Sequence, residues 1–511
     1  MTPARPHFAT VAAAVIAWLA FTAWIRPLML PDEGRYVGVA WEMLRSGEWF
    51  TPTLDGLPYF HKPPLFYWIT GGSLALFGLN EWAGRLAPML GAALAGLSLY
   101  LFARRWASER VARWSLVVLM AQPMFFIGGQ FANLDMLVAG CITATILALA
   151  HAVLDARGDR PARGAVVLGY GLAALGVLAK GLIGAVLPGG VVVVWLLLLG
   201  RWRMLLRLVS LPGLVLFLLV AGPWFVVMQW RFAAFFDYFF IVQHFKRFAE
   251  SGFNNAQPFW FYPAVLAVVT LPWFVWLPRA LGRGYWTGTA TPATRPVRLL
   301  MALWLVLIVG FFSLPQSKLV GYVLPAIAPL AFLIADAALT GPALSRRLQA
   351  AWLASAGVAV ALCLGALALV MAYPQGSQRE LGRALASAHA AGEPVVFLHD
   401  YYFDVAFYAH LREPARVVED WTNPAYATTD DWRRELRDAA TFVPNAAPVL
   451  FTPADVPALL CAAPVSWIVA EDAMAQRYPA LAQARKVASA QEATLWRLER
   501  SVACPAEMKK S

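Results

Sequence analysis

The sequence is short of charged residues. Lys, Arg, Asp and Glu make up 14% of its 511 residues, whereas hydrophobic residues make up 60%. An average soluble protein is about one quarter charged and about half apolar. The composition therefore argues against an ordinary soluble protein and indicates one that lies mostly in a lipid bilayer.

Acidic residues are the scarcer kind of charge. The chain has 30 Asp and Glu against 41 Lys and Arg, which gives a formal net charge of +11. A basic chain can bind nucleic acid, but here most of the positive charge lies in short loops between apolar segments. Arginine in such loops sets membrane orientation and attracts anionic lipid headgroups. We therefore expect membrane lipids, and no nucleic acid, as partners.

Cysteine is also rare, with four residues in the whole chain. Cys141 and Cys363 lie in apolar segments, where we expect ordinary buried thiols. Cys461 and Cys504 lie in the polar C-terminal region, where an oxidising compartment would allow a disulfide. The sequence leaves the disulfide and two free thiols as equal alternatives.

Internal repeats and low-complexity segments are absent, and long apolar runs dominate instead. A membrane span needs about 20 such residues. Eleven spans are predicted, at 9–30, 82–103, 111–127, 134–154, 165–179, 181–199, 205–229, 259–281, 298–313, 320–340 and 350–372. The stretch Leu65–Phe77 is a re-entrant segment or an additional span, so we expect eleven to thirteen membrane spans in total. The first run lacks a signal-peptide cleavage site and is predicted to be retained.

Every second loop between these spans is basic, and all of its basic residues are arginines. They are Arg104, Arg105, Arg110, Arg113, Arg157, Arg160, Arg163, Arg201, Arg203, Arg207, Arg279, Arg283, Arg295, Arg298, Arg346 and Arg347. The positive-inside rule makes these loops cytoplasmic and the N-terminus cytoplasmic. Loops 31–81 and 230–258 are then external, on the periplasmic side of a bacterial inner membrane.

The predicted fold class is an α-helical polytopic membrane protein with a small C-terminal α/β domain. The membrane domain covers 1–372, and the periplasmic domain covers 373–511. Period-2 apolar stretches predict strands in the second domain. They lie at Val395–His399, Pro448–Phe451, Trp467–Ala470 and Thr494–Leu498.

An acidic pair, Asp32-Glu33, stands directly after the first span. A carboxylate at the membrane boundary remains easily ionised but is partly shielded, which suits a catalytic role. The stretch Tyr36–Leu44 places apolar residues on one helical face and predicts an interfacial helix lying on the membrane. The alternative is that the acidic pair only caps this helix.

Several cations gather on the external side, against the positive-inside bias. Lys62 is held by two prolines in Tyr59-Phe60-His61-Lys62-Pro63-Pro64, and others are Lys180, Lys246, Arg247 and Lys318. They predict a pocket for a phosphorylated lipid, and the alternative is scattered anchoring to headgroups.

Two further features lie on this side. Asp135 begins the span at 134–154, where a carboxylate can be catalytic or can simply complement the helix dipole. His61 and His244, with a carboxylate, could hold a divalent metal.

At this point the sequence resembles the bacterial GT-C glycosyltransferases. The runs that carry the resemblance are D-E-G-R-Y, W-E-M-L-R-S-G-E-W, Y-F-H-K-P-P-L-F-Y-W, L-A-K-G, H-F-K-R-F and K-L-V-G-Y-V-L-P. The most similar members are the lipid A aminoarabinose transferase and the protein O-mannosyltransferases, and the resemblance covers residues 8–372. It implies transfer of one sugar from a polyprenyl-phosphate donor to a lipid A, glycan or protein acceptor at the periplasmic face.

The resemblance also implies roles for single residues. Asp32 matches the catalytic aspartate, with Glu33 beside it, and Asp135 matches a second acidic position. The donor phosphate would be held by Lys62, Arg247 and Tyr322, with Lys318 in the same motif. The chain departs from the aminoarabinose transferases at His61, where they carry Glu, so the ligand set for a metal is changed.

The chemistry supports this assignment independently. A lipid phosphate leaves as a stable anion, so it needs fixed cations and no general acid. The acceptor hydroxyl needs a base, for which Asp32 is the candidate. Direct displacement inverts the anomeric centre, and a double displacement remains the alternative. The rival function is a lipid-linked sugar or solute transporter, which would carry ionisable residues near the membrane midplane and repeated halves.

Overall fold

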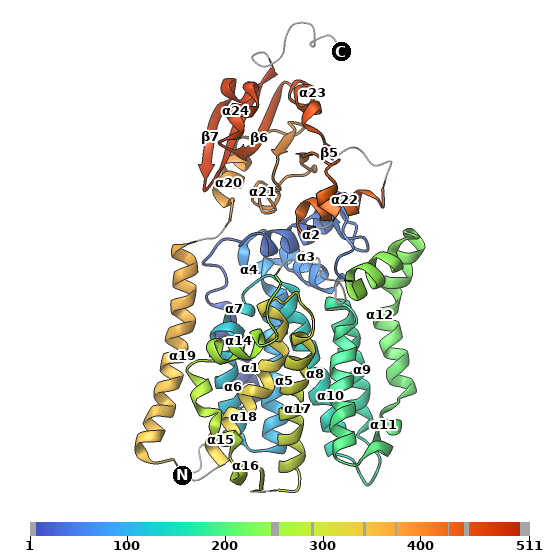
Figure 1. The fold of residues 1–511 in the computed structure, drawn as a ribbon, viewed down its shortest axis with the longest axis vertical. Helices are drawn as coiled ribbons and strands as arrows, with labels where there is room; N and C mark the ends of the chain where they lie inside the picture. Colours follow the sequence, from blue (N-terminus) through green and yellow to red (C-terminus); the bar gives the residue numbers. More distant parts are fainter. Residues whose placement is uncertain are drawn as a thin grey trace.

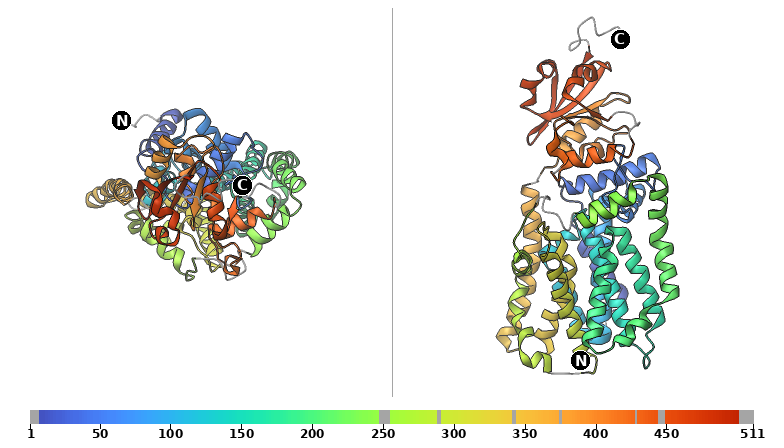
Figure 2. Two further views of the ribbon diagram at one scale, coloured as in Figure 1. Left: turned by 90° about the horizontal axis from the view of Figure 1, so that it is seen from above. Right: turned by 45° about the vertical axis from the view of Figure 1, so that its right-hand side comes forward.

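The fold is taken from a computed structural model that describes residues 7–246, 255–287, 291–340, 344–373, 376–427, 429–443 and 449–500. A bundle of long helices forms the lower part of the molecule (Figure 1). A layer of short helices lies across its upper end, and a C-terminal sheet stands on that layer (Figure 2). The protein is a multi-pass membrane protein of mostly helical class, as the sequence predicts.

Seven helices in the described residues are long and apolar enough to cross a membrane. They are α5 (Leu86–Trp106), α8 (Leu134–Leu154), α9 (Arg163–Lys180), α12 (Leu211–Arg231), α17 (Thr294–Ser313), η3 with α18 (Val320–Thr340) and α19 (Arg346–Ala372). The pair α14 (Phe261–Val269) and η2–α15 (Trp273–Leu281) makes an eighth if it is one span, with a bend of 100° at the break.

The remaining predicted spans are helical but short or interrupted. α1 (Phe8–Ala20) and α10 (Ile183–Leu198) have 13 and 16 residues. The predicted span 111–127 divides into α6 (Glu109–Met120) and α7 (Pro123–Gly128), because Pro123 cannot continue the hydrogen bonding of α6. Leu65–Phe77 forms the 13-residue α3. Within the described residues, seven or eight helices therefore reach the length of a full span, and α1, α10 and the interrupted pair α6–α7 make up the difference from the eleven predicted.

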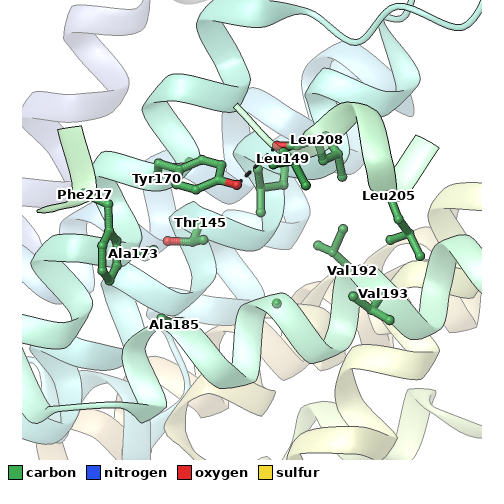
Figure 3. A pocket seen from close by; sticks show the side chains of 13 residues that line it. Thr145, Leu149, Tyr170, Ala173, Ala185, Val192, Val193, Leu205, Leu208 and Phe217 are labelled. Carbon is green, nitrogen blue, oxygen red and sulfur yellow. Dashed lines mark hydrogen bonds between the residues drawn. The ribbon is translucent and has the colours of Figure 1, made fainter. Parts of the chain in front are cut away.

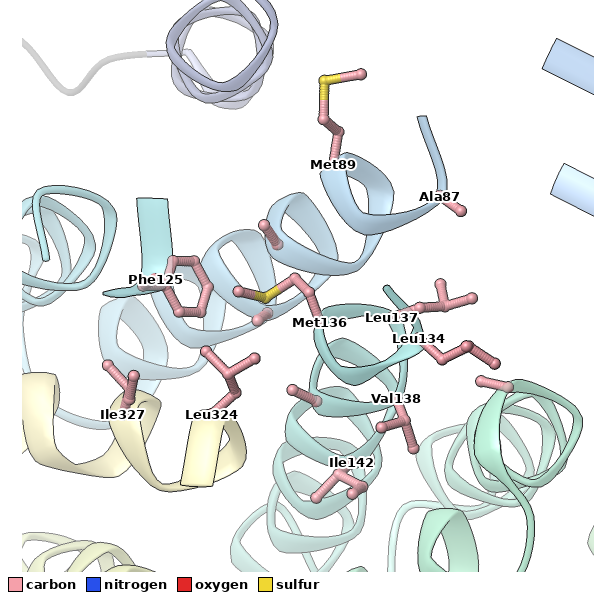
Figure 4. Packing of buried hydrophobic residues seen from close by; sticks show 14 of the residues in the cluster. Ala87, Met89, Phe125, Leu134, Met136, Leu137, Val138, Ile142, Leu324 and Ile327 are labelled. Carbon is pink, nitrogen blue, oxygen red and sulfur yellow. The ribbon is translucent and has the colours of Figure 1, made fainter. Parts of the chain in front are cut away.

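The bundle core is built where α5, α7, α8, η3 and α18 meet. Met136, Leu137 and Ile142 of α8 pack there together with Leu324 and residues of the neighbouring helices (Figure 4). α5 and α8 approach closely because glycines face each other. A Cβ atom on Gly140 would lie 2.2 Å from the carbonyl oxygen of Gly91. Small residues of this kind allow membrane helices to pack backbone to backbone.

The first loop forms a layer above the bundle. It contains α2 (Asp32–Ser46), the hairpin β1–β2 (Thr53–Leu54 and Leu57–Pro58), α3 and α4 (Glu81–Gly84). α2 has buried residues around most of its circumference, including Gly34, Val37, Val39 and Met43. The predicted interfacial helix is therefore wrong: the C-terminal region covers α2, so it does not lie exposed on the membrane.

Short helices connect the other spans. They are α11 (Trp202–Leu208), the π-helix η1 (Asp237–Lys246), and α16 (Arg283–Thr287).

The C-terminal region contains a six-stranded mixed sheet of order β5-β4-β3-β6-β8-β7. The strands are β3 (Val395–Leu398), β4 (Arg416–Val418), β5 (Leu450–Phe451), β6 (Val465–Glu471), β7 (Arg485–Ala490) and β8 (Ala493–Glu499). β3 to β6 pair in parallel, and β7 and β8 are antiparallel. The α/β class expected for this region is confirmed.

Helices flank this sheet and link its strands. They are α20 (Arg379–Ala388), α21 (Val405–Tyr408), η4 (Pro424–Ala427), α22 (Trp432–Ala440), η5 (Pro453–Asp455), α23 (Val456–Cys461), α24 (Met474–Arg477) and η6 (Pro479–Gln483). Cys461 at the end of α23 is disulfide-bonded, and Cys504, its expected partner, lies outside the described residues. Cys141 and Cys363 are free and buried, as predicted.

The C-terminal region is fastened to the first loop by polar contacts. Arg35 of α2 pairs with Glu435 of α22 at 3.1 Å, and the Arg45 guanidinium donates to the carbonyl of Leu411 at 2.6 Å. An aromatic contact between the rings of Phe60 and Phe442, 4.8 Å apart, adds to the interface. These contacts cover the side of α2 away from the bundle and fix the orientation of its N-terminus.

Candidate active site

A cavity of about 920 Å³ lies where the upper ends of the helices meet the first loop. Its polar end is formed by Asp32, Asn133 and Asp135. The remaining wall is apolar and comes from α7, η3, α19 and the segment 268–271. The cavity therefore combines two carboxylates with an extended apolar surface, which suits a molecule with a polar head and a hydrocarbon tail.

Asp32 is the first residue of α2, and 34% of its side chain is exposed. Its Oδ2 accepts a hydrogen bond of 2.8 Å from the Asn133 side-chain amide, and its Oδ1 lies 3.8 Å from the Arg35 guanidinium. The N-cap position of α2 is Pro31, and no side-chain capping bond is present there. Asp32 is thus held toward the cavity by a neighbouring loop, which capping alone does not explain.

Asn133 positions both carboxylates. It is the N-cap of α8, and its side-chain oxygen accepts a 2.9 Å bond from the backbone N–H of Asp135. Its amide nitrogen donates to Asp32. A single side chain therefore fixes the distance between the two acidic residues predicted for the site.

Asp135 forms an ion pair with Lys180, the last residue of α9. The Lys180 ammonium also lies 4.6 Å from the centre of the Tyr322 ring, so Tyr322 reaches the same cluster. Gly321 allows η3 to approach. A Cβ atom at this position would lie 2.3 Å from Oδ2 of Asp135. The structure thus brings together Asp135, Tyr322 and Lys180, and it places Lys180, one of the external cations that predicted a phosphate pocket, at the candidate site.

Glu33 is enclosed by the protein and has a structural role, whereas its neighbour Asp32 faces the cavity. Its side chain is fully buried and accepts bonds from Arg26 and Arg85, and from the backbone N–H groups of Met29 and Ala132 at 2.9 and 2.8 Å. Burial by itself raises the pKa of Glu33, but the two arginines outweigh it and lower the pKa to about 2. No face of this carboxylate is left for a substrate, so we remove Glu33 from the candidate catalytic groups.

The other predicted phosphate-binding cations are placed less directly. The Lys318 ammonium is buried and donates to the carbonyls of Gln257 and Pro315, so it braces the segments 255–257 and 315–318. Lys62 is half-buried in the loop before α3 and is not part of the cavity wall. Arg247 lies outside the described residues.

Of the two tentative metal ligands, the structure describes the side chain of His61 alone. His61 stacks on Tyr59, with ring centres 4.8 Å apart, and its Nε2 is hydrogen-bonded to the Tyr238 hydroxyl at 2.6 Å. The side chain of His244 lies outside the described residues. Within the described ranges, no three His, Cys, Asp or Glu side chains are grouped to hold a metal ion. Metal dependence therefore stays a prediction from sequence.

Known proteins resemble this chain in sequence. The family described as dolichyl-phosphate-mannose-protein mannosyltransferase matches residues 61–227. An undecaprenyl phosphate-alpha-4-amino-4-deoxy-L-arabinose arabinosyl transferase of Pseudomonas paraeruginosa is 40% identical over 332 residues, which are 63% of this chain and 57% of the relative. One from Pseudomonas aeruginosa is 38% identical over 61% of this chain and 55% of the relative. The chain spans little more than half the length of these relatives.

Solved structures extend the comparison to the whole chain. ArnT from Cupriavidus metallidurans in the apo state has a TM-score of 0.79 and 25% identity, and the match covers 98% of each chain. The same protein bound to undecaprenyl phosphate gives 0.80, with 24% identity and the same coverage. The archaeal oligosaccharyltransferase AglB of Archaeoglobus fulgidus gives 0.52 at 14% identity, over 91% of this chain and 69% of the other.

The fold is that of a GT-C glycosyltransferase. The resemblance to the lipid A aminoarabinose transferase, predicted from the motifs, is confirmed. Within this GT-C fold, Asn133 is the site residue that sequence reasoning missed, whereas Lys180 was already among the external cations that predicted a phosphate pocket. Lys180 stands in the quoted motif L-A-K-G, and Asn133 stands two residues before Asp135. The signal that could have found Asn133 is an asparagine directly before an apolar helix, which is a favoured N-cap residue.

Proposed function

We propose that this protein transfers a single sugar from a polyprenyl-phosphate donor to a lipid A, glycan or protein acceptor. The observation that carries the proposal is the cavity of about 920 Å³, in which a carboxylate pair opens onto an apolar wall. The names of the relatives support a pentose donor on undecaprenyl phosphate. A hexose is the other sugar class compatible with the mannosyltransferase match.

Asp32 is the proposed base. Its bonds to Asn133 and Arg35 leave a third of the side chain exposed at the cavity, where it can take the proton of an acceptor hydroxyl. Asn133 orients the carboxylate, as a positioning residue should. Attack from this side, opposite the departing phosphate, would invert the anomeric centre.

The leaving phosphate needs positive charge beside the polar end of the cavity. Lys180, paired with Asp135, is a described cation that lies there. An arriving phosphate would compete with Asp135 for this ammonium. The ammonium would then stabilise the negative charge that develops on the leaving phosphate. Lys62, Arg247, Tyr322 and Lys318 remain proposed donor contacts on the ground of the family motifs. A divalent metal is proposed as optional, with no step assigned to it.

The proposed location is the bacterial inner membrane, with the cavity facing the periplasm. The arginine-rich loops support this orientation. They lie at the opposite end of the helices from Asp32, since the loops around α11 and α16 are at the bottom and α2 is at the top in Figure 1.

A transfer assay tests the reaction class. Purified protein in lipid vesicles is given undecaprenyl-phosphate aminoarabinose, and undecaprenyl-phosphate mannose in a parallel reaction, each labelled in the sugar. Lipid A, glycan and protein acceptors are analysed separately. Label in one acceptor fraction, with release of undecaprenyl phosphate, is the expected result. Movement of intact lipid-linked sugar across the vesicle membrane without transfer would instead establish a transporter.

A further inference from the structure

A second cavity lies at the opposite end of the bundle from Asp32. It has a volume of about 630 Å³ and is bounded by the loop before α9 and the start of α12. Three arginines line it, Arg160, Arg163 and Arg207. The guanidinium of Arg207 pairs with Asp159 at 3.0 Å, and its side chain remains 41% exposed. Arg160 and Arg163 are exposed as well, so the mouth of this cavity is strongly basic.

Two long helices begin at the same place. α9 has 18 residues and begins at Arg163, while α12 has 21 residues and begins at Leu211. Both residues line the cavity. The N-terminus of a helix carries a partial positive charge. At α12 the Ser210 hydroxyl already accepts from the Gly213 N–H and Pro212 has no N–H, so the contribution there is that of the dipole alone. The helix dipoles therefore reinforce the arginines and make this point favourable for an anion.

An apolar cavity of about 290 Å³ adjoins the basic one, and Val209 lines both. Side chains from α8, α9, α10, α11 and α12 point into this space, among them Leu149, Val192, Leu205 and Phe217 (Figure 3). The Tyr170 hydroxyl at its edge donates to the carbonyl of Leu208 at 3.3 Å. Thr145 adds a second hydroxyl to the wall, and the other lining side chains are hydrocarbon.

We propose that these adjoining cavities bind one anionic phospholipid, independently of the sugar-transfer site. The phosphate lies against Arg160, Arg163 and Arg207, and an acyl chain enters the apolar cavity. Basic pockets between membrane helices recognise such headgroups. A free phosphate or a nucleotide would leave the apolar cavity unused, and a zwitterionic lipid lacks the net charge that three arginines match.

The headgroup part is tested with purified full-length protein by native mass spectrometry and a titration with dioleoyl phosphatidylglycerol. The site variant is R160Q/R163Q/R207Q. The control, R283Q/R346Q/R347Q, removes the same charge from exposed arginines at the same end of the bundle. We expect roughly hundredfold weaker binding in the site variant, the product of three surface charge contacts, and no change in the control. Equal affinities, or equal binding of phosphatidylcholine, would overturn the proposal.

The acyl-chain part is tested by filling the apolar cavity. Gly189 lines it, and a side chain added there meets no atom within 4 Å. Its neighbour Gly190 is equally open but faces away from the cavity. Gly189→Phe should weaken phosphatidylglycerol binding at least tenfold, whereas Gly190→Phe should leave it unchanged. Equal effects, or glycerol phosphate binding as tightly as the lipid, would refute an acyl-chain site. In the headgroup test, the single variant Arg163→Gln replaces R160Q/R163Q/R207Q if that triple variant does not fold.

Discussion

Glu33→Gln provides a test of the structural role that the buried carboxylate plays beneath the site. Glu33 receives six hydrogen bonds: two each from Arg26 and Arg85, and one each from two backbone N–H groups. The glutamine amide cannot accept from the guanidinium that faces it, and both buried arginines lose their counter-charge. Breaking a buried ion pair in this way costs about 3–5 kcal/mol. We therefore expect a large loss of stability, measured as the free energy or temperature of unfolding in detergent.

The pH dependence follows from the direction of the Glu33 pKa. Its folded-state value of about 2 lies below the ordinary value of 4.5. The stabilisation is therefore present above pH 4.5 and is lost as the pH falls toward 2. Glu33→Gln should remove this acid-sensitive part. The matched control is Glu380→Gln, whose side chain is 65% exposed and whose loss should cost less than about 1 kcal/mol. A Glu33→Gln protein as stable as the control variant would refute the reasoning.

Three further predictions follow from the site and the topology. Lys180→Gln leaves Asp135 without its counter-ion. It should lower donor turnover by well over tenfold in a single-turnover assay, since one charge-assisted contact is worth about 1.5–3 kcal/mol. An unchanged rate would remove Lys180 from the site. Gly321→Ala drives a methyl group against Asp135 and should impair sugar transfer. The control Gly310→Ala, in open space on α17, should not. Equal transfer rates would contradict the close approach of η3 to Asp135. A reporter active only in the cytoplasm, fused after Ser511, should be silent, and a strong signal would reverse the proposed orientation.

The helical architecture was largely predictable, because hydropathy marks where a bilayer-spanning helix must lie. The predicted span 134–154 coincides with α8, and 165–179 lies within α9. Sequence failed where a run of apolar residues is not one helix. At Pro123 the run breaks in two, and after Ala20 the chain leaves the helix although apolar residues continue. Hydropathy cannot register such breaks, since they depend on backbone hydrogen bonding.

The cover over α2 was also invisible in sequence. Its helical face of Val39, Ala40 and Met43 looked like membrane contact, but apolar residues bury equally well against protein. The strands β4 and β7 were missed for a different reason. β4 has only three residues, and β7 carries exposed Arg485 and Lys486, so neither shows a clear apolar alternation.

The site was predictable as a set of motifs but not as a geometry. Asp32 and Asp135 share Asn133 as a partner, and Asp135 and Tyr322 share Lys180. Asp32 and Glu33 are adjacent and chemically alike, yet one faces a cavity and the other is enclosed by two arginines. That difference is set by residues far away in sequence, chiefly Arg85 and Asn133, which no local pattern reveals.

The central claim is that Asp32 is the catalytic base, and single-turnover transfer by purified Asp32→Asn tests it most directly. Asparagine keeps the size of the side chain, and its oxygen can still accept the bond from Asn133. Folding and donor binding should therefore be normal, and Asp237→Asn, an exposed carboxylate at the start of η1, serves as the control. Loss of a general base lowers the rate by about 10²–10⁴-fold, and we expect a loss in this range at saturating donor. A rate within a few-fold of the wild-type protein would contradict the account.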